Sequence, residues 1–195
     1  MERRLFDLTT WPAPQPYRLL TGLVVPRPIA WVSTVDAAGI GNLAPHSFFT
    51  VASADPPIVQ FTSVGRKNTL RNIEATGEFV INIVSRELME QMNATAASVD
   101  AAVDEFDLAG VEREPAQQVR PPRVAASPAA LECVLHDVVP VGNSFVVLGR
   151  VLLAAVDEAV LDGDRPAEWL LDPVARLSGS RYVTYGETLS LRRPD

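Results

Sequence analysis

Alternation of hydrophobic and polar positions predicts that β-strands make up most of this chain. Residues 29–35 are rich in β-branched and aromatic side chains, and the turn-forming sequence of residues 36–39 leads into a second strand near Leu43. Residues 58–63 alternate with a period of two, as a half-buried strand does. Further apolar or strand-like segments follow at residues 47–51, 78–84, 131–139 and 145–156.

Helical spacing of hydrophobic residues occurs at two places. Leu70 and Ile73 fall on one helical face, and Gly77 stands where such a helix would end. Residues 88–96 carry a second amphipathic stripe. Many strands with two short helices predict a mainly β fold, a barrel with a few short helices at its periphery.

Prolines mark two segments that we expect to be irregular. Residues 1–20 contain Pro12, Pro14 and Pro16, which predict an extended N-terminal arm. Residues 111–128 hold four more prolines and predict an excursion over the surface instead of a linker between domains. With no internal repeats and a length of 195 residues, we expect residues 1–195 to form one domain.

Composition excludes several classes of protein. The formal net charge is −7 and no basic run occurs, which disfavours nucleic acid as a partner. No window approaches the roughly 18 apolar residues of a membrane span. The single cysteine, Cys133, excludes an internal disulfide and fits a reducing compartment, so we expect a cytoplasmic protein in which this thiol is buried. With two histidines and one cysteine, we expect no metal site.

One candidate binding segment, residues 42–48, combines small and hydrogen-bonding side chains between two strands. A flavin needs such a segment, because its flat ring requires close backbone approach and its polar ring atoms require hydrogen-bond partners. A tight turn in which Asn42 and Ser47 bond to the local backbone would explain the same sequence.

A second candidate segment precedes the first predicted helix. Ser63 and Thr69 flank the cations Arg66 and Lys67, and Asn68 stands near the helix start. Free backbone N–H groups there, together with cations, favour an anion such as a phosphate. The glycine spacing of a P-loop is absent. The alternative is a solvated loop in which Asn68 or Thr69 caps the helix.

Two further polar segments could belong to a site. Residues 26–34 contain Arg27 and end with the hydroxyls of Ser33 and Thr34, although a strand that finishes in core packing would look the same. Residues 176–182 form a polar turn that could close over a site, including one in a neighbouring subunit, or could lie on the surface. No catalytic triad or carboxylate pair stands out, so we assign no catalytic residue and expect a cofactor to supply the chemistry.

Taken in order, these four segments resemble the flavin reductase-like family, in particular the flavoredoxin-type branch of the FMN-binding split barrels. The resemblance extends from about Pro26 to Tyr182. It also includes Asp55-Pro56-Pro57, residues 69–73, 77–82 and 105–110, Pro121-Pro122-Arg123, Leu131-Glu132-Cys133 and residues 148–151. The resemblance implies a split β-barrel of Greek-key type that binds FMN as a homodimer.

The resemblance also assigns roles to residues. Those expected to bind the cofactor are Ser33, Thr34, Asn42, Leu43, Ala44, Pro45, His46, Ser47, Ser63, Arg66, Lys67, Asn68 and Thr69. Arg27, Arg176 and Tyr182 are candidates for contact with substrate or a partner subunit. We expect the side chains of Leu43 and Phe48 to pack into the barrel.

Three positions depart from the family pattern. Asn68 replaces the usual aspartate, which removes a negative charge near the phosphate and is expected still to cap the helix. His46 stands where a tyrosine is expected. Residues 143–145 lack the histidine that reductase relatives often carry before the last long strand.

The leading functional interpretation is an oxidoreductase that passes a hydride from NADH or NADPH to FMN. The main alternative is an FMN-holding electron carrier or flavin-binding module without pyridine-nucleotide activity, which would act with an electron-transfer or monooxygenase partner. A degenerate barrel with a structural role and a pyridoxamine phosphate oxidase are more distant alternatives. The sequence leaves open the choice of nucleotide and whether the flavin stays bound or diffuses.

Overall fold

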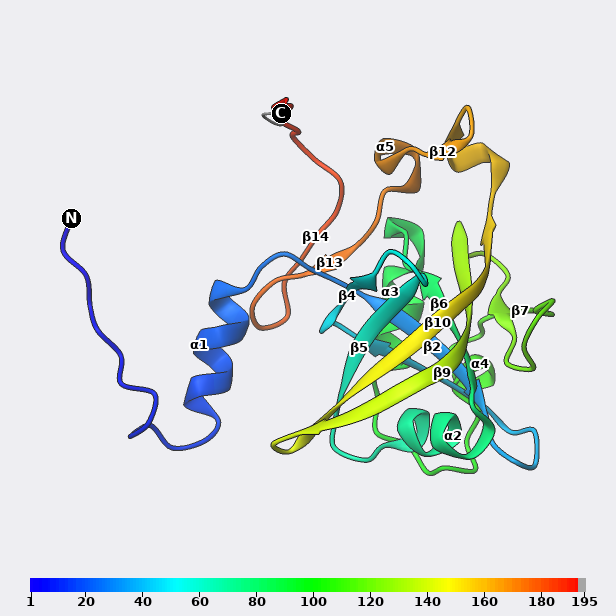
Figure 1. The fold of residues 1–195 in the computed structure, drawn as a ribbon, viewed down its shortest axis with the longest axis horizontal. Coiled ribbons are helices and arrows are strands. Elements are labelled where there is room, and N and C mark those ends of the chain that lie inside the picture. Colours follow the sequence, from blue (N-terminus) through cyan, green and yellow to red (C-terminus); the bar gives the residue numbers. More distant parts are fainter. Residues whose placement is uncertain (193–195) are drawn as a thin grey trace.

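A seven-stranded antiparallel sheet dominates the computed structural model, which describes residues 1–192 (Figure 1). The strand order is β3-β2-β6-β9-β10-β5-β4. The strands are β2 (Ala30–Val35), β3 (Gly41–His46), β4 (Phe49–Ser53), β5 (Ile58–Val64), β6 (Glu78–Ile83), β9 (Ala129–Val141) and β10 (Ser144–Val156). All seven fall where the sequence pattern predicts strand or apolar segments.

The two outer strands of this sheet, β3 and β4, are neighbours along the chain. Only Ser47 and Phe48 separate them, so the sheet curls until its first and last strands meet. The backbone N–H of Thr62 in β5 donates to the carbonyl of Phe48 at 2.9 Å, so the pairing of β4 with its neighbour β5 extends into the junction. This junction brings residues from both ends of the sheet order to one place.

The interior of the curled sheet is filled by aromatic and aliphatic side chains. Phe61 and Phe79 are fully buried and pack edge to face, with ring centroids 5.8 Å apart. Leu70 and Ile73 of helix α2 (Asn68–Thr76) join the same cluster. Cys133 is buried there too, as predicted, and burial raises the pKa of its thiol to about 12.

Helix α2 confirms the first helical pattern in the sequence. Gly77 follows it with a φ of 73°, and its N–H donates to the carbonyl of Ile73 at 2.8 Å. The second pattern becomes the 3₁₀ turn η1 (Arg86–Leu88) and helix α3 (Met89–Ala94). Within residues 1–192, three α-helices went unpredicted: α1 (Gln15–Leu23), α4 (Glu105–Leu108) and α5 (Glu168–Leu171).

The prediction of an extended arm over residues 1–20 is wrong for its last part, because α1 begins at Gln15. Pro14 is the N-cap and Pro16 lies in the first turn, where the missing N–H costs no intrahelical bond. The prolines thus mark the start of a helix and not its absence.

Residues 111–128 are also more ordered than predicted. Strands β7 (Arg113–Glu114) and β8 (Arg123–Val124) pair within them. The fully buried carboxylate of Glu132 accepts backbone hydrogen bonds from Gln117 and Gln118, at 3.0 and 2.6 Å for Oε2. Buried polar contacts therefore attach this segment to the sheet.

Short strand pairs complete the fold. A three-stranded sheet joins β1 (Arg27–Pro28), β13 (Ala175–Arg176) and β14 (Tyr182–Val183) in the order β1-β13-β14. The strands β11 (Leu161–Asp162) and β12 (Arg165–Pro166) pair after the 3₁₀ turn η2 (Glu158–Val160). None of the helices within residues 1–192 combines the length and the apolar character that crossing a membrane requires.

Candidate functional site

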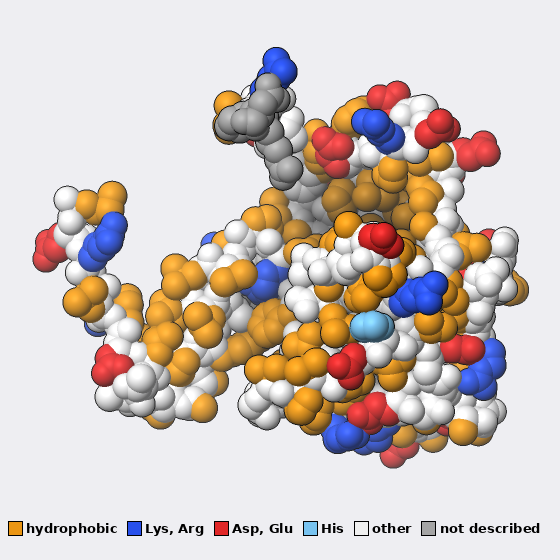
Figure 2. All heavy atoms as spheres, in the orientation of Figure 1, with side chains coloured by type: hydrophobic (Ala, Val, Ile, Leu, Met, Phe, Trp, Pro, Cys, Tyr) orange, Lys and Arg blue, Asp and Glu red, His pale blue; other side chains and the backbone are white. Residues whose placement is uncertain are grey.

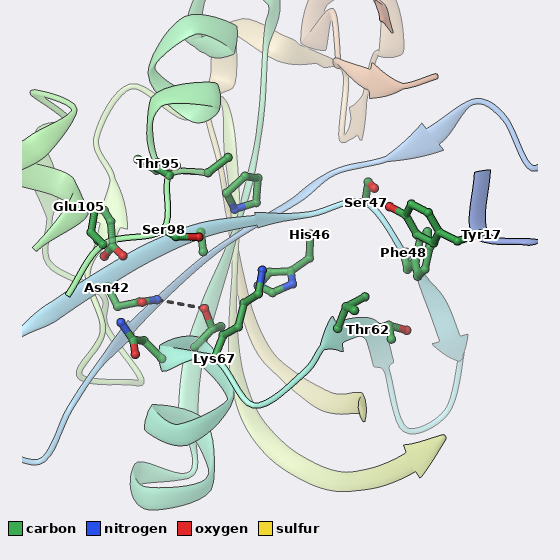
Figure 3. Close-up of a pocket in the computed structure, with 18 residues that line it drawn as sticks. Tyr17, Asn42, His46, Ser47, Phe48, Thr62, Lys67, Thr95, Ser98 and Glu105 are labelled. Atoms are coloured by element: carbon green, nitrogen blue, oxygen red, sulfur yellow. Dashed lines mark hydrogen bonds between the residues drawn. The ribbon is translucent and has the colours of Figure 1, made fainter. Parts of the chain in front are cut away.

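A cavity of about 540 Å³ lies at the junction of β3 and β4, beside the start of α2 (Figure 3). Its walls come from β3, the α2 N-terminus and the segment after α3. The lining residues are Tyr17, Asn42, Ala44, Pro45, His46, Ser47, Phe48, Thr62, Val64, Lys67, Asn68, Thr69, Thr95, Ala96, Ala97, Ser98, Val99 and Glu105. The structure thus brings together two sequence segments that were each ambiguous alone, residues 42–47 and residues 67–69.

The start of α2 forms one end of this cavity. Lys67 is the N-cap residue, and its side chain makes no hydrogen bond that caps the helix. Thr69 is buried, and its Oγ1 accepts a hydrogen bond from Nδ2 of Asn42 at 3.1 Å. The prediction that Asn68 caps the helix is wrong, because Asn68 is the first helical residue and its Oδ1 accepts from Arg71. With respect to side chains within residues 1–192, the helix start therefore keeps uncapped N–H donors beside a cation.

His46 forms the floor of the cavity at the end of β3. Its ring lies 4.7 Å from the ring of Phe61, and only 9% of the residue is exposed. Burial lowers the pKa of its imidazole to about 4. A hydrogen-bond contribution from the Thr62 backbone raises this pKa, and the positive charge of Lys67 lowers it. The imidazole is therefore neutral at pH 7.

The Nε2 atom of His46 makes no hydrogen bond of normal length with any residue in the described part of the chain, although it is buried. Leaving such an atom unpaired costs roughly 1–3 kcal/mol. In Figure 3 the Lys67 side chain extends toward this ring from the opposite wall. His46 and Lys67 thus present an uncharged nitrogen without a described partner and a cation to the same cavity.

Three residues predicted to bind the cofactor do not line this cavity. Ser33 is buried and donates to the carbonyl of Pro122 at 2.5 Å. Thr34 is buried and accepts from the amide of Asn72 at 3.1 Å. The Leu43 side chain is buried with Trp31 and Phe106, in a cluster separate from the one that fills the barrel, so the prediction that it packs into the barrel is wrong. A role of these three residues in cofactor binding stays a prediction.

Ser63 and Arg66 also lie outside the cavity lining. The buried Ser63 hydroxyl donates to the carbonyl of Gly65 at 2.9 Å. Arg66 forms an ion pair with Glu74 at 2.5 Å and lies over the ring of Phe145. Both side chains stabilise the loop that carries Lys67, and direct contact with a ligand stays a prediction for them.

Phe48 does not pack into the barrel as the sequence pattern suggested. It is half-buried and lines the cavity, with its ring centroid 6.4 Å from that of Tyr17. The reason is that Phe48 lies between β3 and β4. The alternation of inward and outward side chains, which would have pointed Phe48 into the barrel, applies only within a strand. Its position makes it part of the cavity wall.

The cavity wall formed by residues 95–99 and Glu105 was not predicted from the sequence. Residues 95–99 carry no distinctive motif, and they are fixed partly by Trp31, whose Nε1 donates to Oγ1 of Thr95 at 2.9 Å. Glu105 is 4% exposed, its Oε2 accepts from the N–H of Leu43 at 3.1 Å, and burial raises its pKa. The only sequence signal for Glu105 was the family resemblance of Glu105-Phe106.

A second cavity of about 600 Å³ adjoins the first and shares Tyr17, Pro45, Ser47 and Ala96 with it. Arg27, Arg176 and Tyr182, the three residues predicted to contact substrate or a partner subunit, all line this second cavity. Sequence segments 149 positions apart thus meet beside the first cavity, through the pairing of β1 with β13.

Comparison with known proteins establishes the family. The sequence profile of the flavin reductase like domain matches residues 22–172, and the chain belongs to this family. An uncharacterised protein of Aquifex aeolicus is 39% identical over 178 residues, which cover 88% of this chain and 91% of that protein. The family is one of flavin-dependent oxidoreductases, which confirms the resemblance drawn from the sequence.

Solved structures confirm the fold. Nitrilotriacetate monooxygenase component B from Bacillus cereus superposes with a TM-score of 0.95 at 30% identity, over 98% of this chain and 100% of that one. A split-barrel domain protein from Shewanella frigidimarina gives 0.86 at 23% identity, over 95% and 96%. Flavoredoxin of Desulfovibrio vulgaris gives 0.79 at 26% identity, over 86% and 91%. The predicted mainly β split barrel is therefore correct.

The first cavity fits a flavin chemically. Its volume lies within the range of about 300–1,000 Å³ that is common for cofactor sites. The buried, unpaired Nε2 of His46 offers a partner to a polar ring atom, and the free N–H groups at the start of α2 offer partners to a phosphate. The residues present can hold both ends of such a molecule.

Proposed function

We propose that this protein binds FMN in the first cavity and catalyses its reduction by NADH or NADPH. The observation that carries the proposal is the single cavity that joins the unpaired Nε2 of His46 to the free N-terminus of α2 beside Lys67. An isoalloxazine ring with a phosphate-bearing chain has matching polar groups at its two ends.

The phosphate of FMN belongs at the α2 end in this proposal. Backbone N–H groups and the helix dipole favour an anion there, and Lys67 adds a full positive charge. Asn68 and Thr69 line the same end and offer an amide and a hydroxyl. Because Asn68 replaces an acidic residue of the family pattern, no carboxylate at that position repels the phosphate.

The ring belongs along residues 42–47. Ala44 and Pro45 keep side chains small where a flat ring must approach the backbone, and Ser47 offers a hydroxyl at the cavity wall. His46 offers Nε2 as a donor or an acceptor, according to its tautomer. When bound, the flavin supplies the hydride-accepting chemistry, while these residues orient it and exclude water.

The second candidate is an FMN-holding electron carrier. The similarity to flavoredoxin, at 26% identity over 86% of this chain, favours this alternative. Residues 143–145, which lack the histidine expected of reductase relatives, are compatible with it. The two candidates share the flavin site and differ in what donates the electrons.

The visible spectrum of the purified protein, before and after anaerobic NADH or NADPH, tests the proposal. A bound-flavin spectrum that bleaches rapidly, with repeated turnover once oxygen is admitted, supports the reductase. Bleaching only by an added redox protein supports the carrier. A colourless protein that takes up neither FMN nor riboflavin on titration contradicts both functions and leaves a structural role.

We further propose that the protein is a homodimer that delivers reduced flavin to a monooxygenase. The similarity to a monooxygenase component from Bacillus cereus supports the partner. The dimer is supported by α1, which stands away from the sheet with hydrophobic side chains on its surface (Figures 1 and 2). Leu20, Leu23 and Val24 are 50%, 69% and 61% exposed there.

One-domain organisation and a cytoplasmic location remain predictions.

A further inference from the structure

The second cavity has a strongly positive lining. Arg18, Arg27 and Arg176 all line it, and within residues 1–192 no aspartate or glutamate does so. None of these three arginines forms an ion pair with a described residue. Three uncompensated guanidinium groups in one hollow contrast with the net charge of −7 for the whole chain.

Arg27 is buried and rigidly held. It is 7% exposed, and its Nη1 donates to the carbonyls of Thr21 and Val24 at 2.6 and 2.7 Å, while Nη2 donates to that of Leu177 at 3.0 Å. Its buried Nε has no partner among the described residues. Carbonyl dipoles orient the guanidinium group, but they leave its full charge without a counter-ion.

Arg176 faces the cavity from the neighbouring strand. It lies directly opposite Arg27 in the β1–β13 pair, so both side chains start from the same face of the small sheet. Its guanidinium donates to the hydroxyl of Tyr182 and, at 2.5 Å, to the carbonyl of Gly179. Like charges in directly opposite positions destabilise a sheet, and an anion bound between them would remove that repulsion.

We propose that Arg27 and Arg176, with Arg18 at the rim, form a subsite for the pyrophosphate of the pyridine nucleotide. The identity of the ligand rests on the function proposed above, whereas the anion site rests on the geometry of the second cavity. Pro45 and Ser47 line both cavities, so a nucleotide anchored at the arginines reaches the proposed position of the flavin ring. Guanidinium groups bind phosphate oxygens through paired, charge-assisted hydrogen bonds.

Titration of the FMN-saturated protein with inorganic pyrophosphate, followed by calorimetry, tests the subsite without turnover. With FMN present, the α2 end of the first cavity is occupied. Arg176→Gln should weaken pyrophosphate about tenfold or more, since each arginine contributes charged hydrogen bonds, and Arg176→Lys should lose less. Arg18→Gln gives a second test at an exposed position on α1. Arg181→Gln is the matched control, because Arg181 lies in the same turn but outside the cavity lining.

Kinetics then link the subsite to the nucleotide. Arg176→Gln should raise the KM for NADH about tenfold, while the loss of rate with N-benzyl-1,4-dihydronicotinamide, which carries no phosphate, should be much smaller. Equal pyrophosphate affinity in wild type, Arg176→Gln and Arg18→Gln would overturn the subsite, whatever the turnover. A wild type that oxidises neither donor would contradict the proposed reductase, while pyrophosphate binding lost in Arg176→Gln would still establish the anion site.

Discussion

The side-chain amide of Asn42 donates to Oγ1 of Thr69 at 3.1 Å and so links strand β3 to the first turn of α2 (Figure 3). Both residues are almost fully buried, at 5% and 1% exposure. The bond fixes the spacing between the segment proposed to hold the flavin ring and the helix end proposed to hold its phosphate. A site with this spacing already set needs less reorganisation when the ligand binds.

Replacing Lys67 by alanine should weaken FMN much more than riboflavin. A charge-assisted hydrogen bond contributes about 1.5–3 kcal/mol, which corresponds to about tenfold or more in the dissociation constant. Riboflavin lacks the phosphate and should lose much less. Fluorescence titration with each ligand measures the two ratios.

The neighbouring cation gives a matched control for this variant. Arg66 is paired with Glu74 and lies outside the cavity lining, so Arg66→Ala should cost less FMN affinity than Lys67→Ala. Equal losses of affinity for FMN and riboflavin in Lys67→Ala would contradict the placement of the phosphate at the α2 end.

Replacing Ser47 by alanine should change the spectrum or the reduction potential of bound flavin. Polar groups near the ring set these properties, and Ser47 lines the cavity at the proposed ring position. Asn42→Ala should act in the same direction, although it also breaks the bond to Thr69. The comparison is Lys67→Ala at saturating FMN, which should leave spectrum and potential nearly unchanged.

If residues 42–47 form only a structural turn, the result differs. Ser47→Ala would then leave the spectrum of the saturated protein unchanged and lower the free energy of unfolding by about 1 kcal/mol. Spectra and urea unfolding on the same samples separate these outcomes.

Acid should destabilise the flavin-free protein through His46. Its pKa falls from 6.5 to about 4 on folding, so between these values the unfolded chain binds more protons than the folded one. The free energy of unfolding should therefore decrease as pH drops from about 6.5 towards 4, by about 3 kcal/mol at most from this residue. Urea unfolding at a series of pH values measures the slope.

Both histidines of the chain are needed for this experiment. His46→Gln should flatten the pH dependence in that window, whereas His136→Gln should keep it, since His136 is exposed on β9. The same slope in wild type and His46→Gln would show that the buried imidazole does not titrate as its surroundings imply.

The sequence predicted the strands well because each carries its own local pattern. Phe48 was predicted wrongly because it lies in the β3–β4 junction, where the alternation of the strands is interrupted. Helix α1 was missed because its prolines suggested an extended chain, although proline also suits the first turn of a helix. Of the site, the local segments at residues 42–47 and 67–69 were visible. Residues 95–99 were not, because only the fold brings a segment without a motif to the opposite wall. Arg18 escaped notice because it lies in the unpredicted helix.

Close packing at Gly149 gives a stability prediction for the barrel. A Cβ atom there would lie 2.2 Å from Cζ of Phe79, whose ring is fully buried against Phe61. Gly149→Ala should therefore lower the free energy of unfolding by about 1–3 kcal/mol, as overpacked cores do. Gly186→Ala is the control: its nearest contact is 4.0 Å away, and a change within about 0.5 kcal/mol is expected. Similar stabilities for the two variants in urea would contradict the tight contact.

Light scattering at micromolar concentration should give about twice the chain mass of 21.1 kDa. The physical reason is α1, because a helix with several exposed apolar side chains gains stability by burying them, and a closed two-fold assembly is the commonest way to do so. Leu23, 69% exposed on α1, is the residue to change: Leu23→Glu should shift the protein towards the monomer. Leu108→Glu, at a 52% exposed leucine on α4, should leave the mass unchanged. A wild-type monomer that retains FMN would contradict the dimer, and dissociation by both variants would place the interface elsewhere than on α1.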